Sequence, residues 1–161
     1  MTTITPIPLT AEGFAPFGDV IELGTKAFKI NDGMCDRHHD LAQLEFLEGK
    51  AGISLFQAVP RELPYAIDLV ERHPKGSQAF IPMYLTSFLV IVAPDENGTP
   101  GTPLAFLTNP GQGINLQRNT WHGVLTPLQS PGLFAVIDRI GDDTNLEEHI
   151  FETQYVVDSP G

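Results

Sequence analysis

GQGINLQRNTWHGVL, residues 111–125, is the stretch that decides the fold. Apolar and polar side chains alternate from Ile114 to Gln117, which is the period of a half-buried strand. The segment RNT at 118–120 interrupts the alternation, and His122 lies at the start of the next strand. The stretch therefore predicts two strands joined by a tight bend that carries a cluster of polar side chains.

A second polar cluster, ERHPKGSQ at residues 71–78, lies upstream with the same order of polar residues, turn and apolar strand. Glu71 and His73 are two residues apart, so on a strand they point to the same side, and Gln78 begins the next strand. We expect the scaffold to bring this cluster face to face with the one at 117–122. A carboxylate, two imidazoles and several amides would then converge in one pocket.

The composition favours short strands over long helices. The chain has 161 residues, of which 42% are hydrophobic, enough to form a core. Its 14 prolines and 15 glycines imply many turns, and about ten short strands bounded by turns can be identified. With no internal repeat and no linker, the sequence predicts one mainly all-β domain over residues 1–161, a barrel or sandwich with one or two short helices.

Individual elements are predicted from alternation and from turn residues. Thr10 caps a short helix that runs to about Phe17 and is ended by Gly18. A helical turn is expected at 146–151 and a frayed tail at 156–161. Strands are expected at 4–9, 19–23, 28–30, 53–59, 65–70, 78–83, 87–93, 104–108, 114–117 and 132–139, of which 87–93 is a continuous apolar run and the most buried.

Charge and cysteine content exclude several classes of function. The formal net charge of -11 argues against nucleic-acid binding, because neutralising phosphates needs clustered Lys and Arg. A small anionic substrate is still compatible, since two or three local arginines override the global field. The single cysteine, Cys35, excludes an intrachain disulfide, and the sequence shows no signal peptide and no apolar run of membrane-spanning length. We therefore expect a soluble, cytoplasmic protein.

Two interpretations of the polar clusters are open on the residues alone. The first makes His73 and His122 an acid–base pair in a barrel, since small barrels often hold one ligand in their mouth. The second makes each a solvent-facing or hydrogen-bonded structural side chain at a strand end. A third cluster, RHHD at 37–40, contains adjacent residues that diverge on a strand, so we interpret it as a loop or subunit contact.

Both main clusters resemble the two motifs of the cupin superfamily. The pattern E-x-H-x4-Q at 71–78 has the spacing of the first motif, with Glu71 at its first His position, Gln78 at its acid position and Leu85 in place of its closing Gly. The pattern G-x5-Q-x-N-x2-H at 111–122 has the spacing of the second motif. It keeps the first Gly and the His, whereas Gln, Asn and Thr at 117, 119 and 126 replace Pro, Gly and Asn.

Longer segments lie along nearly the whole chain: FxxFGDVIE at 14–22, HDLA at 39–42, ERHPxGxQAFIPM at 71–83, RNxWH at 118–122 and IDR at 137–139. Together they resemble the ureidoglycolate lyase family. The resemblance implies a cupin-like β-barrel and a homodimer. It also implies cleavage of (S)-ureidoglycolate to glyoxylate and urea in allantoin breakdown, and in some members a divalent metal, nickel among them.

This elimination needs a base for the substrate hydroxyl and an acid for the departing urea nitrogen. We assign these roles to His73 and His122, in undecided order, with Glu71 as a third catalytic residue. The substrate carboxylate needs a guanidinium, and the urea end needs amide or carboxylate partners. The predicted substrate-binding residues are Arg72 or Arg118 for the carboxylate, Gln78 and Asn119 with Glu71 for the urea end, and Trp121.

No cofactor is expected to be essential. The alternative is a divalent metal such as nickel, bound by Glu71, His73, Gln78 and His122, although Gln is a poor ligand. Two rival functions stay open: a ureidoglycolate amidohydrolase releasing ammonia and CO2, and a cupin-like module that binds a small acid without turnover. The expected partner is a small-molecule substrate, with no nucleic acid and no membrane. Among the departures from the cupin motifs, Leu85 in place of the closing Gly matters most, because a turn there could require a positive φ.

Overall fold

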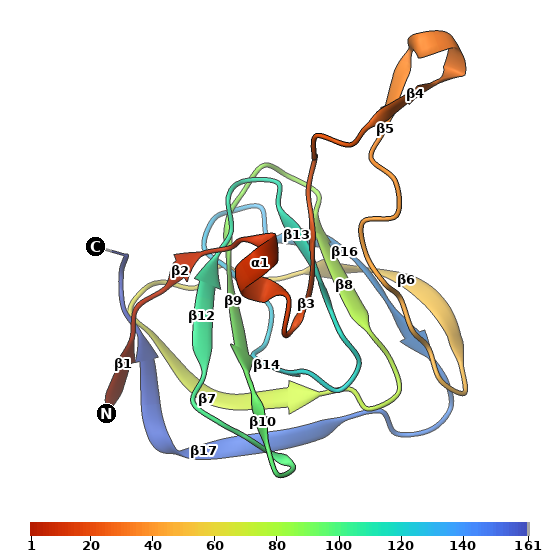
Figure 1. Ribbon diagram of the computed structural model, residues 1–161. Helices are drawn as coiled ribbons and strands as arrows, with labels where there is room; N and C mark the ends of the chain where they lie inside the picture. Colours follow the sequence, from red (N-terminus) through yellow and green to blue (C-terminus); the bar gives the residue numbers. More distant parts are fainter. Residues whose placement is uncertain (161) are drawn as a thin grey trace.

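The computed structural model describes residues 1–160, whose regular structure is almost entirely β (Figure 1). It contains one single-turn α-helix, α1 (Ala11–Phe14), and one 3-10 turn, η1 (Asn31–Gly33). The prediction of an all-β, cupin-like fold with one or two short helices is confirmed. The strands are β1 (Thr2–Ile4), β2 (Ile7–Pro8), β3 (Gly18–Ile21), β4 (Phe28–Ile30), β5 (Cys35–Arg37), β6 (Lys50–Gln57), β7 (Tyr65–Arg72), β8 (Gln78–Pro82), β9 (Phe88–Ala93), β10 (Asp95–Glu96), β11 (Thr99–Pro100), β12 (Leu104–Leu107), β13 (Gly113–Leu116), β14 (Trp121–His122), β15 (Thr126–Pro127), β16 (Leu133–Ile140) and β17 (Glu147–Val157).

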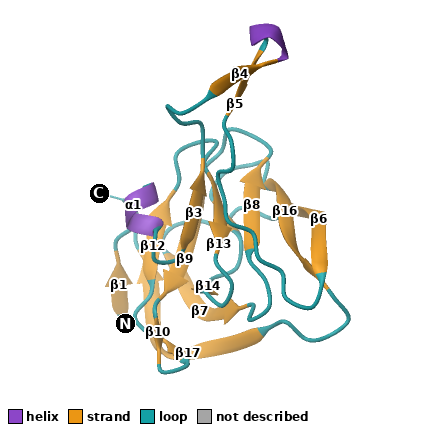
Figure 2. Cartoon of the chain, turned by 45° about the vertical axis from the view of Figure 1, so that its right-hand side comes forward, coloured by secondary structure: helices purple, strands orange, loops and turns teal. Residues whose placement is uncertain are grey.

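Most strands belong to two sheets that lie against each other (Figure 2). The larger sheet has the order β1-β17-β7-β14-β9-β12-β2, with β15 paired to β9, and the smaller has the order β3-β13-β8-β16-β6. The pairs β10–β11 and β4–β5 form separate two-stranded hairpins. The larger sheet curls, so that β7 and β17 run across one end of the smaller sheet (Figure 1). This curl carries the end of β7, and the polar cluster that follows it, toward the smaller sheet.

Period-2 alternation builds the core between the sheets. On β16, Phe134 and Val136 are buried in one apolar cluster with Phe88 and Val90 of β9. Phe88 and Phe134 meet edge to face, with ring centroids 5.0 Å apart. The prediction that 87–93 is the most buried strand agrees with β9, which is buried along its whole length. A second apolar cluster covers the other face of β9, and it consists of Ile67, Val70, Leu89, Ile91, Ala93, Ala105, Trp121 and Val157.

The C-terminal prediction is wrong in two respects. Residues 146–151 do not form a helical turn, because β17 pairs with β7 from Glu147 onward. Phe151 packs edge to face against Tyr155, with centroids 5.0 Å apart, so strand pairing and aromatic packing override the local helix preference. The tail is also paired as far as Val157, which is fully buried. Residue 161 of the predicted frayed tail lies outside the described residues.

Local backbone geometry tests two predictions, the helix capped by Thr10 and the turn at Leu85. Thr10 does cap α1, since its Oγ1 accepts a hydrogen bond from Gly13 N at 3.0 Å, but the helix ends at Phe14 rather than Phe17. Within residues 1–160, six non-glycine residues have positive φ, and Leu85 is not one of them. The concern that Leu85 occupies a position reserved for glycine is therefore removed.

The hairpin formed by β4, η1 and β5 projects from the body of the molecule (Figure 2). Its strands bury no residue, and Met34 at its tip is 87% exposed. The RHHD segment lies at its base, where His38 accepts a hydrogen bond from Gly24 N at 3.0 Å. None of the helices formed by residues 1–160 has the length and apolar character needed to cross a membrane.

Candidate functional site

Strands β7 and β14 bring the two predicted clusters together. Their antiparallel register places Glu71 directly opposite His122. The ring centroids of His73 and His122 lie 5.1 Å apart, with the planes inclined by 43°. One potential ligand atom from each of Glu71, His73 and His122 lies within 4.8 Å of the others. The prediction that these distant segments converge is confirmed, while their catalytic roles stay a prediction.

Backbone carbonyl groups hold both imidazoles in the same tautomer. His73 Nδ1 lies 2.8 Å from the carbonyl oxygen of Asn145, and His122 Nδ1 lies 2.9 Å from that of Gly123. A carbonyl oxygen only accepts, so each Nδ1 carries the hydrogen and Nε2 of the neutral ring has a lone pair. Within residues 1–160, both Nε2 atoms are buried without a hydrogen-bond partner. The site therefore presents two bare basic nitrogens beside a carboxylate.

Burial shifts the protonation equilibria of this cluster. It lowers the pKa of His122 from 6.5 to about 4, with the electrostatic interaction with His73 acting in the same direction and the bond to Gly123 opposing it. Burial also raises the pKa of the Glu71 carboxyl; His73 lowers it, and Glu148, opposite Glu71 on β17, raises it. At neutral pH His122 is thus an uncharged imidazole.

Gln78 begins β8, as predicted, and lies in the interior between the sheets. Its Nε2 donates to Asp138 Oδ2 at 3.2 Å, while its Oε1 is buried without a partner among the described residues. Gln78 pairs across the sheet with Leu116. Leu116, Phe80 and His122 line a common cavity of ≈ 20 Å³, which has room for one group about the size of a water molecule. Gln78 and His122 therefore border the same interior.

Arg72 and Trp121 lie on the opposite side of their strands. The guanidinium of Arg72 contacts Glu147 Oε2 at 2.5 Å and Asp95 Oδ1 at 3.0 Å, and its central carbon lies 4.2 Å from the centroid of the Trp121 ring. Trp121 Nε1 donates to the same Asp95 oxygen at 2.9 Å. The structure does not bring these two predicted substrate-binding residues together with His73, because adjacent positions on a strand face opposite ways.

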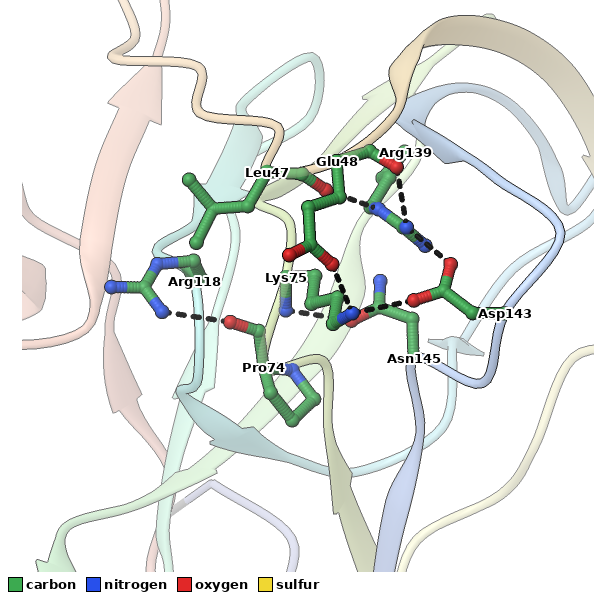
Figure 3. Close-up of polar contacts among 8 residues, drawn as sticks. All are labelled: Leu47, Glu48, Pro74, Lys75, Arg118, Arg139, Asp143 and Asn145. Atoms are coloured by element: carbon green, nitrogen blue, oxygen red, sulfur yellow. Dashed lines mark hydrogen bonds and ion pairs between the residues drawn. The ribbon is translucent and has the colours of Figure 1, made fainter.

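Arg118 and Asn119 lie on the bend between β13 and β14. Asn119 N donates to the His73 carbonyl at 2.9 Å, so the bend is tied directly to the first cluster. Asn119 has a φ of 70°, a left-handed conformation that Asn tolerates, at the position where the cupin motif has Gly. Arg118 Nη1 donates to the Pro74 carbonyl at 2.8 Å, and Nε lies 3.5 Å from Glu45. Its side chain is partly exposed, and Figure 3 shows it beside Pro74, the residue after His73.

A network behind His73 was not identified from the sequence. Asn145 Oδ1 accepts a hydrogen bond from Lys75 N at 2.6 Å, and Lys75 Nζ contacts Asp143 at 2.5 Å and also Glu48. The guanidinium of Arg139, whose side chain is 1% exposed, donates to the carbonyl groups of residues 47 and 48 and pairs with Asp143. Figure 3 shows these side chains pinning the loop after β16 against the turn after β7.

This network fixes the carbonyl group that orients His73. The hydrogen bonds from Lys75 and Arg139 hold the pKa of Asp143 well below its usual range, so the carboxylate stays charged. The sequence signals for the network are Arg139 in the IDR segment and Lys75 in the cluster at 71–78, whereas Glu48, Asp143 and Asn145 come from loops with no periodicity.

Comparison with known proteins identifies the family. A family model described as ureidoglycolate lyase matches residues 1–158. Ureidoglycolate lyase from Rhodobacter capsulatus is 60% identical over 144 residues, which cover 88% of this chain and 89% of the relative. Ureidoglycolate lyase 2 from Rhizobium meliloti is 54% identical over 154 residues, 94% of each chain, and ureidoglycolate lyase from a Chelativorans species is 50% identical over 164 residues, 99% of each. This chain belongs to the ureidoglycolate lyase family.

Proposed function

We propose that this protein is a ureidoglycolate lyase that cleaves (S)-ureidoglycolate to glyoxylate and urea. Its family gives the reaction class. The observation that carries the assignment to a site is the pair of buried, unpartnered Nε2 atoms of His73 and His122 beside Glu71, within the part of the chain that the structure describes. Two bare basic nitrogens close together suit a reaction that moves a proton between neighbouring substrate atoms.

The chemistry needs only one proton to move. The hydroxyl O–H bond breaks as the C=O bond of glyoxylate forms. The C–N bond breaks, its electron pair stays on the urea nitrogen, and that nitrogen takes a proton. Because the net transfer is from oxygen to nitrogen on the same carbon, the His73–His122 pair can begin and end each cycle uncharged. Glu71, opposite His122, stabilises the imidazolium that forms in between.

Arg118 is our proposed partner for the substrate carboxylate. It lies on the bend that Asn119 ties to His73, and its side chain is only partly engaged by Pro74 and Glu45. Arg72 is left out of the proposal, because two carboxylates and an indole ring already occupy its guanidinium. A planar guanidinium fork matches a carboxylate geometrically and remains charged at all working pH values.

Glu71, His73 and His122 also fit a divalent metal, since two imidazole nitrogens without partners and one carboxylate are a common donor set for transition metals. When bound there, such an ion would polarise the substrate hydroxyl. It would occupy the same two Nε2 atoms that the proposed proton transfer uses. We propose that the metal is not essential and that proton transfer by the histidines is the working mechanism.

We further propose a cytoplasmic homodimer. The outer face of the smaller sheet exposes apolar side chains on its edge strand β6, where Ile53 is 78% and Leu55 is 65% exposed. The projecting hairpin exposes Met34 and Phe28 as well. A second copy of the chain would cover these exposed apolar side chains. Sedimentation equilibrium, which gives the mass of the particle in solution, tests this assignment.

The deciding experiment is incubation with racemic ureidoglycolate while urea, glyoxylate and ammonia are followed separately. Lyase activity releases urea and glyoxylate in equal amounts and consumes one enantiomer. Ammonia in place of urea would instead identify the amidohydrolase. Saturable binding without any product would identify a binding module.

A further inference from the structure

The unused hydrogen-bonding capacity of the interior is that of acceptors. His73 and His122 each donate their Nδ1–H to a carbonyl group, and their Nε2 atoms have no hydrogen-bond partner among residues 1–160. Gln78 donates an N–H to Asp138, and its buried Oε1 has no hydrogen-bond partner among residues 1–160. Glu71 and Asp138 are carboxyl groups that accept when ionised. A ligand that fits this interior must therefore bring hydrogen-bond donors.

Asp138 belongs to the same interior as Gln78, although it was not among the predicted site residues. It lies on β16 with the period of Phe134 and Val136, which are buried between the sheets. The register pairs its neighbour Ile137 with Ala79, the residue after Gln78, so Asp138 and Gln78 lie side by side on the inner face. Their side chains meet at 3.2 Å, which turns the amide so that Oε1 is left free.

We propose that Gln78 and Asp138 form the subsite that binds the terminal –NH2 group of the ureido substituent. This rests on the proposed function and adds a residue that decides specificity. The terminal –NH2 of ureidoglycolate carries two N–H donors, whereas its carboxylate offers only acceptors. One N–H pairs with Gln78 Oε1, and the other pairs with the Asp138 carboxylate, which has acceptor sites beyond the one that Gln78 uses.

The pair also explains why the substrate would enter with a fixed direction. A buried acceptor that finds no donor is costly, so a carboxylate placed against Gln78 Oε1 and Asp138 is rejected twice, by missing donors and by charge repulsion. The terminal –NH2, a group about the size of a water molecule, is therefore the part drawn inside, and the carboxylate is left outside near Arg118. The C–N bond that breaks then lies between the two ends, on the side of His73 and His122.

The test compares ureidoglycolate with 2-acetamido-2-hydroxyacetate, in which a methyl group replaces the terminal –NH2 at nearly the same size. Sites built to bond a substrate N–H reject analogues that lack it by roughly 10⁴–10⁵-fold. We expect the ratio of kcat/KM for the two compounds to fall about 10- to 100-fold in Gln78→Met and in Asp138→Ala. Asp138→Asn keeps one acceptor and should retain more of the ratio than Asp138→Ala. Ile137→Val, at the next position but facing outward, should keep it entirely.

The ratio separates recognition from folding and from the proposed function. If both compounds lose the same factor in the variants, Gln78 and Asp138 are structural and the subsite is wrong. If wild-type protein releases no urea, the proposed function fails, and the same ratio is then measured as dissociation constants by calorimetry. Preferential binding of the ureido compound that the variants lose supports the subsite, whereas equal binding or no binding of either compound overturns it.

Discussion

The carbonyl oxygen of Asn145 accepts a hydrogen bond from His73 Nδ1 at 2.8 Å, joining residues 72 positions apart in the chain. This bond decides which nitrogen of His73 carries the hydrogen and hence which one faces the site. The same Asn145 holds Lys75 N through its side chain. The loop after β16 is thus part of the apparatus that positions His73, and it acts through a backbone carbonyl group.

Asn145→Ala removes the acceptor for Lys75 N but leaves the carbonyl group that His73 uses. We expect kcat to fall about tenfold with little change in KM, because a looser loop lets His73 exchange tautomers; tenfold corresponds to about 1.4 kcal/mol in the activation barrier. Steady-state kinetics and the ¹⁵N shifts of the His73 ring check this. Asn145→Asp keeps an oxygen at the same place and should restore most of the rate. An unchanged tautomer together with an unchanged kcat would show that the loop is only structural.

Replacing either imidazole should remove proton transfer. His73→Ala and His122→Ala are each expected to lower kcat by about 10²–10⁴-fold, the usual contribution of a positioned acid or base. Circular dichroism establishes that each variant is folded. His39→Ala is the matched control, since this histidine lies at the base of the projecting hairpin, against Phe28. Wild-type turnover in both folded site variants would exclude the proposed pair.

Arg118 and Arg72 should respond differently to substitution. Arg118→Ala is expected to raise KM about tenfold with a smaller change in kcat, since it removes the partner of the substrate carboxylate, and Arg118→Lys should lie in between. Arg72→Ala breaks contacts with Glu147, Asp95 and the Trp121 ring, so it should lower Tm and leave KM unchanged. Kinetics and thermal unfolding of the two variants distinguish these outcomes. The reverse result would return Arg72 to the site.

Strand alternation predicted the fold and the cluster of Glu71, His73 and His122, because the alternation has a short period and depends only on local sequence. It placed Glu71 and His73 on one side. The same alternation sets Arg72 on the other side, where the structure has it, so the prediction of Arg72 as a substrate-binding residue did not follow the alternation. Asn145 and Asp143 escaped prediction because their contacts join loops that are far apart in sequence and have no repeating pattern. Asp138 had a local signal in the inward period of β16, but only the register shows that it reaches Gln78.

Metal removal tests whether the Nε2 atoms of His73 and His122 transfer protons or bind a metal. We expect protein dialysed against a chelator, and shown by elemental analysis to be metal-free, to retain most of its kcat, because proton transfer by His73 and His122 needs no ion. Added nickel should then inhibit by occupying the same nitrogens. Activity that disappears on chelation and returns with stoichiometric nickel would contradict the proposed mechanism and assign Glu71, His73 and His122 to a metal centre.

The low pKa of His122 makes stability depend on pH in a definite direction. The unfolded ring titrates near 6.5 and the folded ring near 4, so between these values the unfolded state binds more protons. The free energy of unfolding should therefore fall as pH drops from 6.5 to about 4, by on the order of 3 kcal/mol in total. Glu71 acts in the opposite sense, because its raised pKa makes the folded state bind its proton first.

Urea unfolding of metal-free protein across this range measures the effect. His122→Asn removes the titrating ring, so the difference in unfolding free energy between wild type and variant should shrink steadily as the solution is acidified. Glu71→Gln, made in the wild-type protein, removes the opposing contribution. Its unfolding free energy should therefore fall more steeply with acidification than that of the wild type. Parallel curves for wild type and His122→Asn would mean that the folded ring takes up its proton as readily as the unfolded one. A ring that titrates so readily is not the buried, uncharged base that the proposed mechanism requires.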